Sequence, residues 1–182
     1  MQPCTPRQSA REHGIQRVDN DARLSDELAS VISGARRRAV RDGDRQIDTA
    51  HLLHSLLESE PQARAVFGEG PQIARLLGYL VQRSIGYGLR WQSGVEDSGA
   101  VPTVAGTAGF SPLAAASLEC ACRRAAVRGE QARGTDLLAA IVVDPQARAV
   151  EVLTRAGIDP HEVFARLDGW SGLPEECGEG TC

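Results

Sequence analysis

Lysine is absent from this chain of 182 residues, and all 20 of its basic residues are arginine. Within this chain, the absence excludes the lysine of a Walker A phosphate-binding loop, a Schiff-base lysine and a Ser-Lys dyad. The arginine bias itself can follow from genomic base composition alone, so we assign it no functional role. What remains possible is a binding function or a chemistry that needs no lysine.

Aromatic residues make up only 4% of the chain, and no run of eighteen apolar residues occurs. The sequence therefore predicts no transmembrane helix, and the charged residues Arg7, Glu12 and Arg17 interrupt the place where a signal peptide needs an apolar run. The apolar fraction of 42%, rich in alanine, is enough for a core of closely packed helices. We expect a soluble, cytoplasmic, all-α protein.

The sequence also lacks the usual marks of a metal or catalytic site. Its cysteines are an odd set without Cys-x-x-Cys spacing, which are Cys4, Cys120, Cys122, Cys177 and Cys182. His51 and His54 lie three apart on a predicted helix but lack the glutamate and third ligand of a zinc peptidase. No Gly-x-Ser-x-Gly elbow occurs, and Gly86-Tyr87-Gly88 lacks the third glycine of a dinucleotide loop. We expect no metal, no cofactor and no enzymatic activity.

The chain contains an internal duplication. A shift of 86 residues places Leu24-Ser25 on Phe110-Ser111 and Thr49 on Thr135, and the hexapeptide Pro-Gln-Ala-Arg-Ala-Val occurs at both 61–66 and 145–150. We expect a double domain over 24–168, made of one repeat at 24–85, a glycine-rich linker at 86–109 and a second repeat at 110–168. Residues 1–23 and the acidic residues 169–182 are predicted to be mobile tails.

Each repeat is predicted to hold four short helices, so the whole fold is eight helices in two pseudo-symmetric four-helix repeats. Apolar residues recur at three- and four-residue spacing after the expected helix starts. Those starts are Ser25 and Ser111 as N-caps, Thr49 and Thr135 as N-caps, Pro61 and Pro145, and finally Pro71 and Asp159-Pro160.

These repeats resemble the Clp N-terminal domain, the doubled helical module that precedes the ATPase rings of ClpA- and ClpC-type unfoldases. Each repeat of that family begins with Phe-Thr-Pro or a similar sequence and continues with Val-Gly-Thr-Glu-His-Leu-Leu. The matching segments here are Leu24-Ser25-Asp26, Phe110-Ser111-Pro112, Ile47 to Leu53, Gly134 to Leu138, and the turn Gly157-Ile158-Asp159-Pro160. The resemblance covers residues 24–168, and the order and duplication of the motifs carry it.

The resemblance implies a docking function. Such domains receive adaptor proteins or marked substrates for the unfoldase, and in Gram-positive bacterial relatives they bind phosphorylated arginine at the start of the helix with the Thr-Glu-His motif. Here that motif gives Thr49, His51, Thr135 and Asp136 as candidate binding residues, with Ala50 in place of the glutamate and Leu137 in place of the second histidine. If phosphoarginine binding is retained, we expect it at the second repeat. The alternative is that Thr49, Thr135 and Asp136 only cap helices.

Two functions remain open. The first is an adaptor, decoy or regulator of Clp-dependent proteolysis, whose partners are a Clp-type AAA+ unfoldase, its adaptors or marked substrates. The second is a protein that sequesters a small molecule resembling a cyclic peptide antibiotic in the groove between the repeats, where Phe110 matches the family's aromatic residue. Trp91 in the linker is a further candidate contact for a partner. The formal net charge of −4 does not favour nucleic acid as a partner, and no membrane partner is expected.

Overall fold

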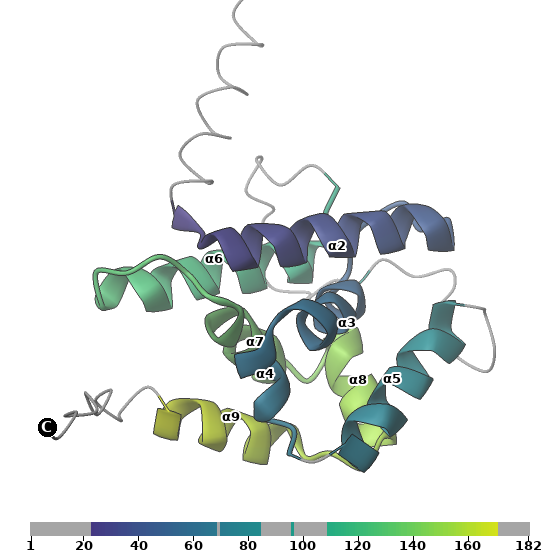
Figure 1. Cartoon of the computed structure of the whole chain (residues 1–182). Coiled ribbons are helices and arrows are strands. Elements are labelled where there is room, and N and C mark those ends of the chain that lie inside the picture. Colours follow the sequence, from purple (N-terminus) through teal and green to yellow (C-terminus); the bar gives the residue numbers. More distant parts are fainter. Residues whose placement is uncertain (1–22, 69, 85–95, 97–108, 171–182) are drawn as a thin grey trace, which may run out of the picture.

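The computed structural model describes residues 23–68, 70–84, 96 and 109–170. These residues form eight helices and no strand. The helices are α2 (Asp26–Asp42), α3 (Thr49–Ser59), α4 (Pro61–Ala65), α5 (Gly70–Ser84), α6 (Pro112–Val127), α7 (Gly134–Val142), α8 (Arg148–Arg155) and α9 (Pro160–Trp170) (Figure 1). The predicted all-α fold of two four-helix repeats is confirmed. Most of the predicted tails and linker, including Tyr87 and Trp91, lies outside the described residues.

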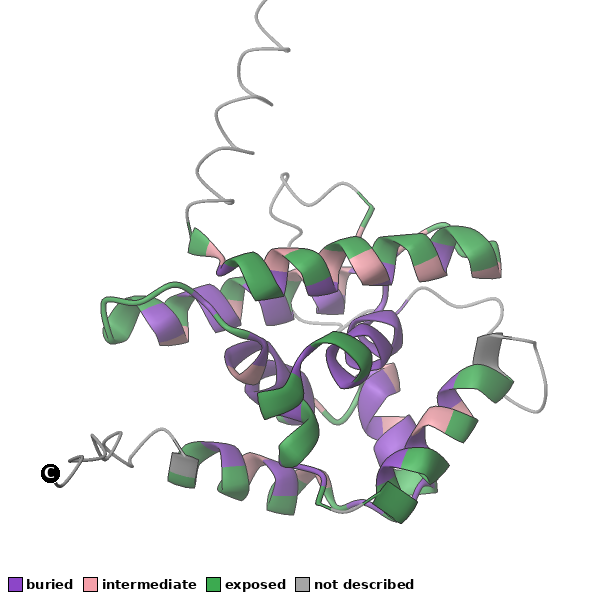
Figure 2. Ribbon diagram, viewed as in Figure 1, coloured by how far each residue is buried: buried purple, intermediate pink, exposed green. Residues whose placement is uncertain are grey.

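Helices α3 and α7 form the centre of the molecule. Helix α3 packs against α2, α4, α5, α6, α7 and α8, and α7 packs against α2, α3, α4, α6, α8 and α9. Residues Thr49 to Leu57 of α3 are all buried, which is typical of a helix enclosed by protein on every side. Figure 2 shows the same concentration of buried residues on these two helices. No helix in the described part of the chain has both the length and the apolar character that crossing a membrane requires.

The two repeats are joined by a reciprocal pair of backbone contacts. Leu24, before α2, forms an isolated parallel bridge with Ala132, before α7, and Phe110, before α6, forms the same bridge with Ile47, before α3. The Ser25 N–H donates to the Ala132 carbonyl at 3.0 Å, and the Ser111 N–H donates to the Ile47 carbonyl at 2.8 Å. Each repeat therefore starts beside the central helix of the other, so the N-terminus of α6 lies close to that of α3.

The first helix of each repeat starts where the sequence predicts. The Ser25 and Ser111 side chains each accept a hydrogen bond from the backbone N–H three residues later, at 3.2 Å. Pro112 occupies the first turn of α6, where its missing N–H costs nothing. Helix α2 ends at Gly43, whose φ of 75° is the left-handed conformation that glycine adopts without strain.

Three of the other predicted helix starts are wrong, namely those at Thr49, Thr135 and Pro145. Asp48, not Thr49, is the N-cap of α3, because its carboxylate accepts the His51 N–H at 3.0 Å. Helix α7 begins at Gly134, so Thr135 is its second residue and not its cap.

Pro145 opens no helix, although Pro61 does so within an identical hexapeptide. The Asp144 side chain accepts the Gln146 N–H at 2.8 Å and the Asp144 carbonyl accepts the Ala147 N–H at 3.0 Å. These bonds form a turn, so α8 begins only at Arg148. The residues around the hexapeptide therefore decide whether its first three residues form a helix or a turn.

Candidate functional site

Three helix starts converge on the buried carboxylate of Glu96, whose residue is 5% exposed. One carboxylate oxygen accepts the Thr49 N–H of α3 at 2.9 Å and the hydroxyl of Ser111, the N-cap of α6, at 2.7 Å. The other accepts the Arg148 N–H of α8 at 2.8 Å and the Thr49 hydroxyl. We call Thr49, Ser111 and the Arg148 backbone the Glu96 cradle. Its backbone N–H groups and the positive ends of the helices stabilise a negative charge at this position.

An ion pair between the repeats adjoins the cradle. The Arg148 guanidinium donates to Asp48 Oδ2 at 2.8 Å, and the Asp48 side chain is only 2% exposed. The Thr49 hydroxyl in turn accepts the Ala149 N–H at 3.1 Å. The cap of α3 in the first repeat is thus bonded to the start of α8 in the second repeat, which fixes the two helix ends relative to each other.

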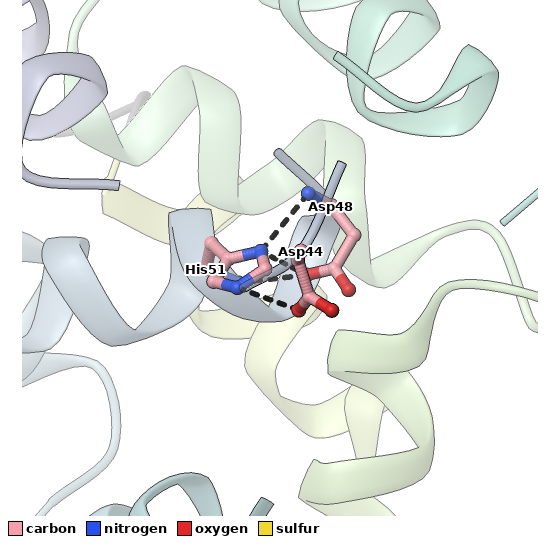
Figure 3. A group of neighbouring side chains, drawn as sticks. All are labelled: Asp44, Asp48 and His51. Carbon is pink, nitrogen blue, oxygen red and sulfur yellow. Dashed lines mark hydrogen bonds and ion pairs between the residues drawn. The ribbon is translucent and has the colours of Figure 1, made fainter. Parts of the chain in front are cut away.

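His51 lies below the surface in the first turn of α3, with 1% of the residue exposed. Its Nδ1 accepts the Asp48 N–H at 3.1 Å, which completes a capping box with the Asp48 carboxylate. Its Nε2 lies 3.2 Å from Asp44 Oδ2 and 3.7 Å from Asp42 Oδ2. Figure 3 shows both ring nitrogens of the imidazole facing Asp44 and Asp48. A partner protein cannot touch this ring directly, so His51 can act on a partner only by positioning the start of α3.

His54, one turn later, faces a different set of groups. Its Nδ1 is 3.4 Å from an Arg38 nitrogen, and its Nε2 is 3.4 Å from a Glu58 oxygen. Burial and, to a smaller extent, the nearby Arg38 charge lower the pKa of His54 to about 4. His54 is therefore neutral at physiological pH, and the two histidines do not share a ligand position.

Helices α3 and α7 align one residue differently from the alignment that the sequence repeat indicated. Asp136 is the third residue of α7, and its carboxylate accepts the Arg133 N–H at 3.0 Å, as His51 Nδ1 accepts the Asp48 N–H in α3. Asp136 therefore corresponds to His51, and Gly134 corresponds to Thr49. The shift of 86 that pairs Thr49 with Thr135 is one residue too large here, because four residues lie between Gly129 and Gly134 whereas five lie between Gly43 and Thr49.

The Asp136 carboxylate already has strong partners inside the protein. A single Arg128 nitrogen donates to both of its oxygens, at 2.8 and 2.9 Å, and Asp136 is only 5% exposed. Thr135 is half-buried. An incoming guanidinium would have to replace Arg128 before it could bind Asp136.

Glu60, the residue between α3 and α4, packs against the start of α7. A methyl group added to Gly134 would come within 2.7 Å of Glu60 Cγ and 2.9 Å of Leu56 Cδ2, so the two chains approach closely. Glu60 is 7% exposed, and burial raises the pKa of its carboxyl, as does the neighbouring Glu27, whereas Arg133 opposes the shift. A glutamate is therefore placed near the start of each central helix, Glu96 at α3 and Glu60 at α7.

The remaining predicted residues contribute less to this arrangement. Phe110 is half-buried and packs against the core beside Ile47. Trp91 lies outside the described residues. Sequence reasoning missed Glu96, Asp48, Arg148 and Asp44, and of these only Asp48 carried a local signal, as an aspartate one residue before a helix.

Comparisons with known proteins show the fold. No protein-family model and no curated protein sequence matches the chain. Among solved structures, the chain is similar to the crystal structure of the N-terminal domain of the caseinolytic protease associated chaperone ClpD from Arabidopsis thaliana. The two share a TM-score of 0.61 and 18% sequence identity, over 84% of this chain and 96% of that one. The fold is therefore that of a Clp N-terminal domain, as the sequence resemblance implied.

Proposed function

We propose that this chain is a non-catalytic, cytoplasmic protein-interaction module that binds a Clp-type AAA+ unfoldase, its adaptors or its marked substrates. In this proposal it modulates Clp-dependent proteolysis as an adaptor, decoy or regulator. The observation that supports the proposal is the shared fold, which extends over 96% of the ClpD domain. Because the chain has no lysine, it carries no Walker A motif, and ATP hydrolysis has to come from the partner.

The contacts of the buried polar groups support a binding role over a catalytic one. The Glu96 carboxylate accepts four hydrogen bonds from the cradle, and Asp136 is held by Arg128 and the Arg133 N–H. Groups that are satisfied in this way fix helix ends in place, and they are not poised to exchange protons with a substrate.

Phosphoarginine is one ligand that the proposal includes, and the two repeats would receive it differently. In the first repeat, Glu96 occupies the donors that a phosphate group would need. In the second repeat, Arg128 occupies the carboxylate that a ligand guanidinium would need. Internal partners therefore compete with the ligand in both repeats.

This competition gives a prediction for Arg128→Ala. The substitution removes the guanidinium from Asp136, so we expect phosphoarginine to bind this variant at least about tenfold more tightly than the unchanged chain, by analogy with the usual strength of paired guanidinium contacts. Titration followed by amide chemical shifts at Thr135 and Asp136 measures the effect. Arg155→Ala, on the exposed Arg155–Glu151 pair, is the matched control and leaves the affinity unchanged. Equal binding to both variants would show that Asp136 does not hold the ligand.

Affinity purification of the tagged full chain from its source cells tests the proposed partner. Recovery of a Clp-type unfoldase or one of its adaptors is the expected result. The sequestration hypothesis predicts instead a purified chain carrying a small organic compound. Phe110 is half-buried and packs against the core, and its described contacts favour neither outcome.

A further inference from the structure

We propose that the outer face of α2 is a docking surface for an acidic segment of a partner protein, in which carboxylates flank an apolar side chain. We call Arg36, Arg37, Val40 and Arg41 the α2 arginine face. The inference rests on the proposed function in one respect, namely that the chain binds a protein partner. It does not depend on that partner belonging to the Clp system.

The α2 arginine face lies on the side of the helix that is turned away from the core. Successive residues of an α-helix are rotated by about 100° around its axis, so the four residues fall within an arc of about 140°. All four are exposed, and Val40 is 75% exposed. Figure 2 shows exposed residues along this outer side of α2. The opposite side of the helix is buried, at Leu28, Val31, Ala35 and Ala39.

Two arginines of this face have no carboxylate partner in the described part of the chain. No described residue forms a hydrogen bond or an ion pair with the side chain of Arg36 or of Arg37. Arg41 lies 3.3 Å from Asp42, its neighbour in the chain. After Glu27, no acidic residue of α2 is exposed. This end of the helix therefore presents a positively charged surface, although the whole chain has a net charge of −4.

The exposed valine among these cations favours a protein ligand. Guanidinium groups bind carboxylates through paired hydrogen bonds, and Val40 adds an apolar contact between them. Protein interfaces combine the two kinds of contact, with arginine enriched among their residues. Nucleic acid binding needs a broad basic surface, whereas this face has three arginines on a chain of net charge −4. An acidic peptide segment is therefore the occupant that fits.

The first helix of the second repeat carries a smaller surface of the same kind. Arg123 and Val127 of α6 are four residues apart, as Arg36 and Val40 are in α2. Both are exposed, Val127 to 89%, and within the described ranges the Arg123 side chain has no partner. The same pairing of a free guanidinium with an exposed valine thus occurs in both repeats. The α2 arginine face has two such guanidinium groups, so we expect it to bind more strongly.

The test uses a fluorescein-labelled peptide made of repeated Glu-Glu-Leu units, titrated with the full chain at low salt and followed by fluorescence anisotropy. We expect saturable binding. In the double variant Arg36→Glu/Arg37→Glu the affinity should fall at least about tenfold, because like charges then face each other. Arg64→Glu/Arg75→Glu is the matched control. It reverses two exposed arginines of α4 and α5, so the net charge changes equally, and it leaves the affinity unchanged.

Val40→Ser tests the apolar part of the contact. The substitution keeps every charge, so the loss of a buried valine should weaken peptide binding at least about threefold. Val81→Ser, at a valine of α5 that is 49% exposed, is the control and leaves the affinity unchanged. The peptide assay contains no Clp component, so its failure and the failure of the Clp purification are separate results.

Equal affinity of the acidic peptide for the two double variants would overturn the proposal. Absence of saturable binding to the unchanged chain would overturn it as well. So would tighter binding of a single-stranded oligonucleotide that is lost in Arg36→Glu/Arg37→Glu, since the surface would then recognise nucleic acid. All the substituted side chains are exposed, and circular dichroism checks that each variant is folded.

Discussion

At the scale of single residues, the buried polar groups of this protein act mainly as fixed points for helix ends. Glu96 shows this most clearly, because one carboxylate satisfies donors from α3, α6 and α8. A single side chain between the two repeats therefore holds parts of both. Sequence could not predict this role, since Glu96 lies in a glycine-rich segment without periodicity, and its partners are 15 to 52 residues away.

Substitution Glu96→Ala tests this role. It leaves buried donors of the cradle without an acceptor, so we expect the free energy of unfolding to fall by about 2–4 kcal/mol. Urea denaturation of the variant and the unchanged chain measures the difference. Glu162→Ala removes an exposed glutamate that pairs with Arg166 at 3.5 Å, and this control should change stability by less than about 0.5 kcal/mol. A loss of that small size in Glu96→Ala would contradict the cradle.

His54 gives a prediction for pH. Its pKa is lowered from 6.5 to about 4 in the folded protein, so between these values the unfolded chain binds more protons than the folded one. Stability therefore decreases as the pH falls from about 6.5 towards 4, and this contribution changes little below that range. Unfolding free energies measured from pH 7 to 4 should fall less steeply in His54→Gln. Parallel profiles for the two proteins would show that His54 is not buried as a neutral ring.

At the scale of helices, starts that depend on local side chains could be predicted, and starts that depend on distant contacts could not. Ser25 and Ser111 cap their helices through the N–H three residues later, a bond that the sequence alone specifies. Pro61 and Pro145 show the opposite case. The hexapeptide begins with a helix after Glu60, whereas in its second copy the helix begins only at Arg148, whose N–H donates to Glu96, 52 residues away. The sequence comparison also aligned α3 and α7 one residue out of register. The reason is that the loop from Gly129 to α7 is one residue shorter than the loop from Gly43 to α3.

The crossing of α2 and α3 gives a prediction at this scale. An added Cβ on Gly34 would lie 2.3 Å from Ser55 Oγ, whose hydroxyl donates to the Val31 carbonyl at 2.7 Å. Gly34→Ala should lower the free energy of unfolding by about 1–3 kcal/mol, although alanine is the better helix former. Gly78→Ala in α5, where no atom lies within 4 Å, should be neutral or stabilising. Equal effects from the two substitutions, measured by thermal unfolding, would contradict the close crossing.

At the scale of the whole molecule, the duplicated pattern was enough to predict the fold. The reciprocal bridges Leu24–Ala132 and Ile47–Phe110 give the physical reason, because each repeat starts on the loop before the central helix of the other. Neither repeat is complete without that contact, so a duplicated sequence indicates a single interlocked unit. The candidate site lies at this interlock, and it could not be predicted because its groups come from both repeats and from the segment between them.

The most direct measurement of the proposed function is the rate of substrate degradation by a reconstituted Clp-type unfoldase and its peptidase, with increasing amounts of the purified chain. The account predicts a saturable, dose-dependent change in rate, slower for a decoy or inhibitor and faster for an adaptor. An unrelated helical protein of similar size serves as the control and has no effect. An unchanged rate at saturating excess of the chain, across the unfoldases and substrates of the source organism, would contradict the account.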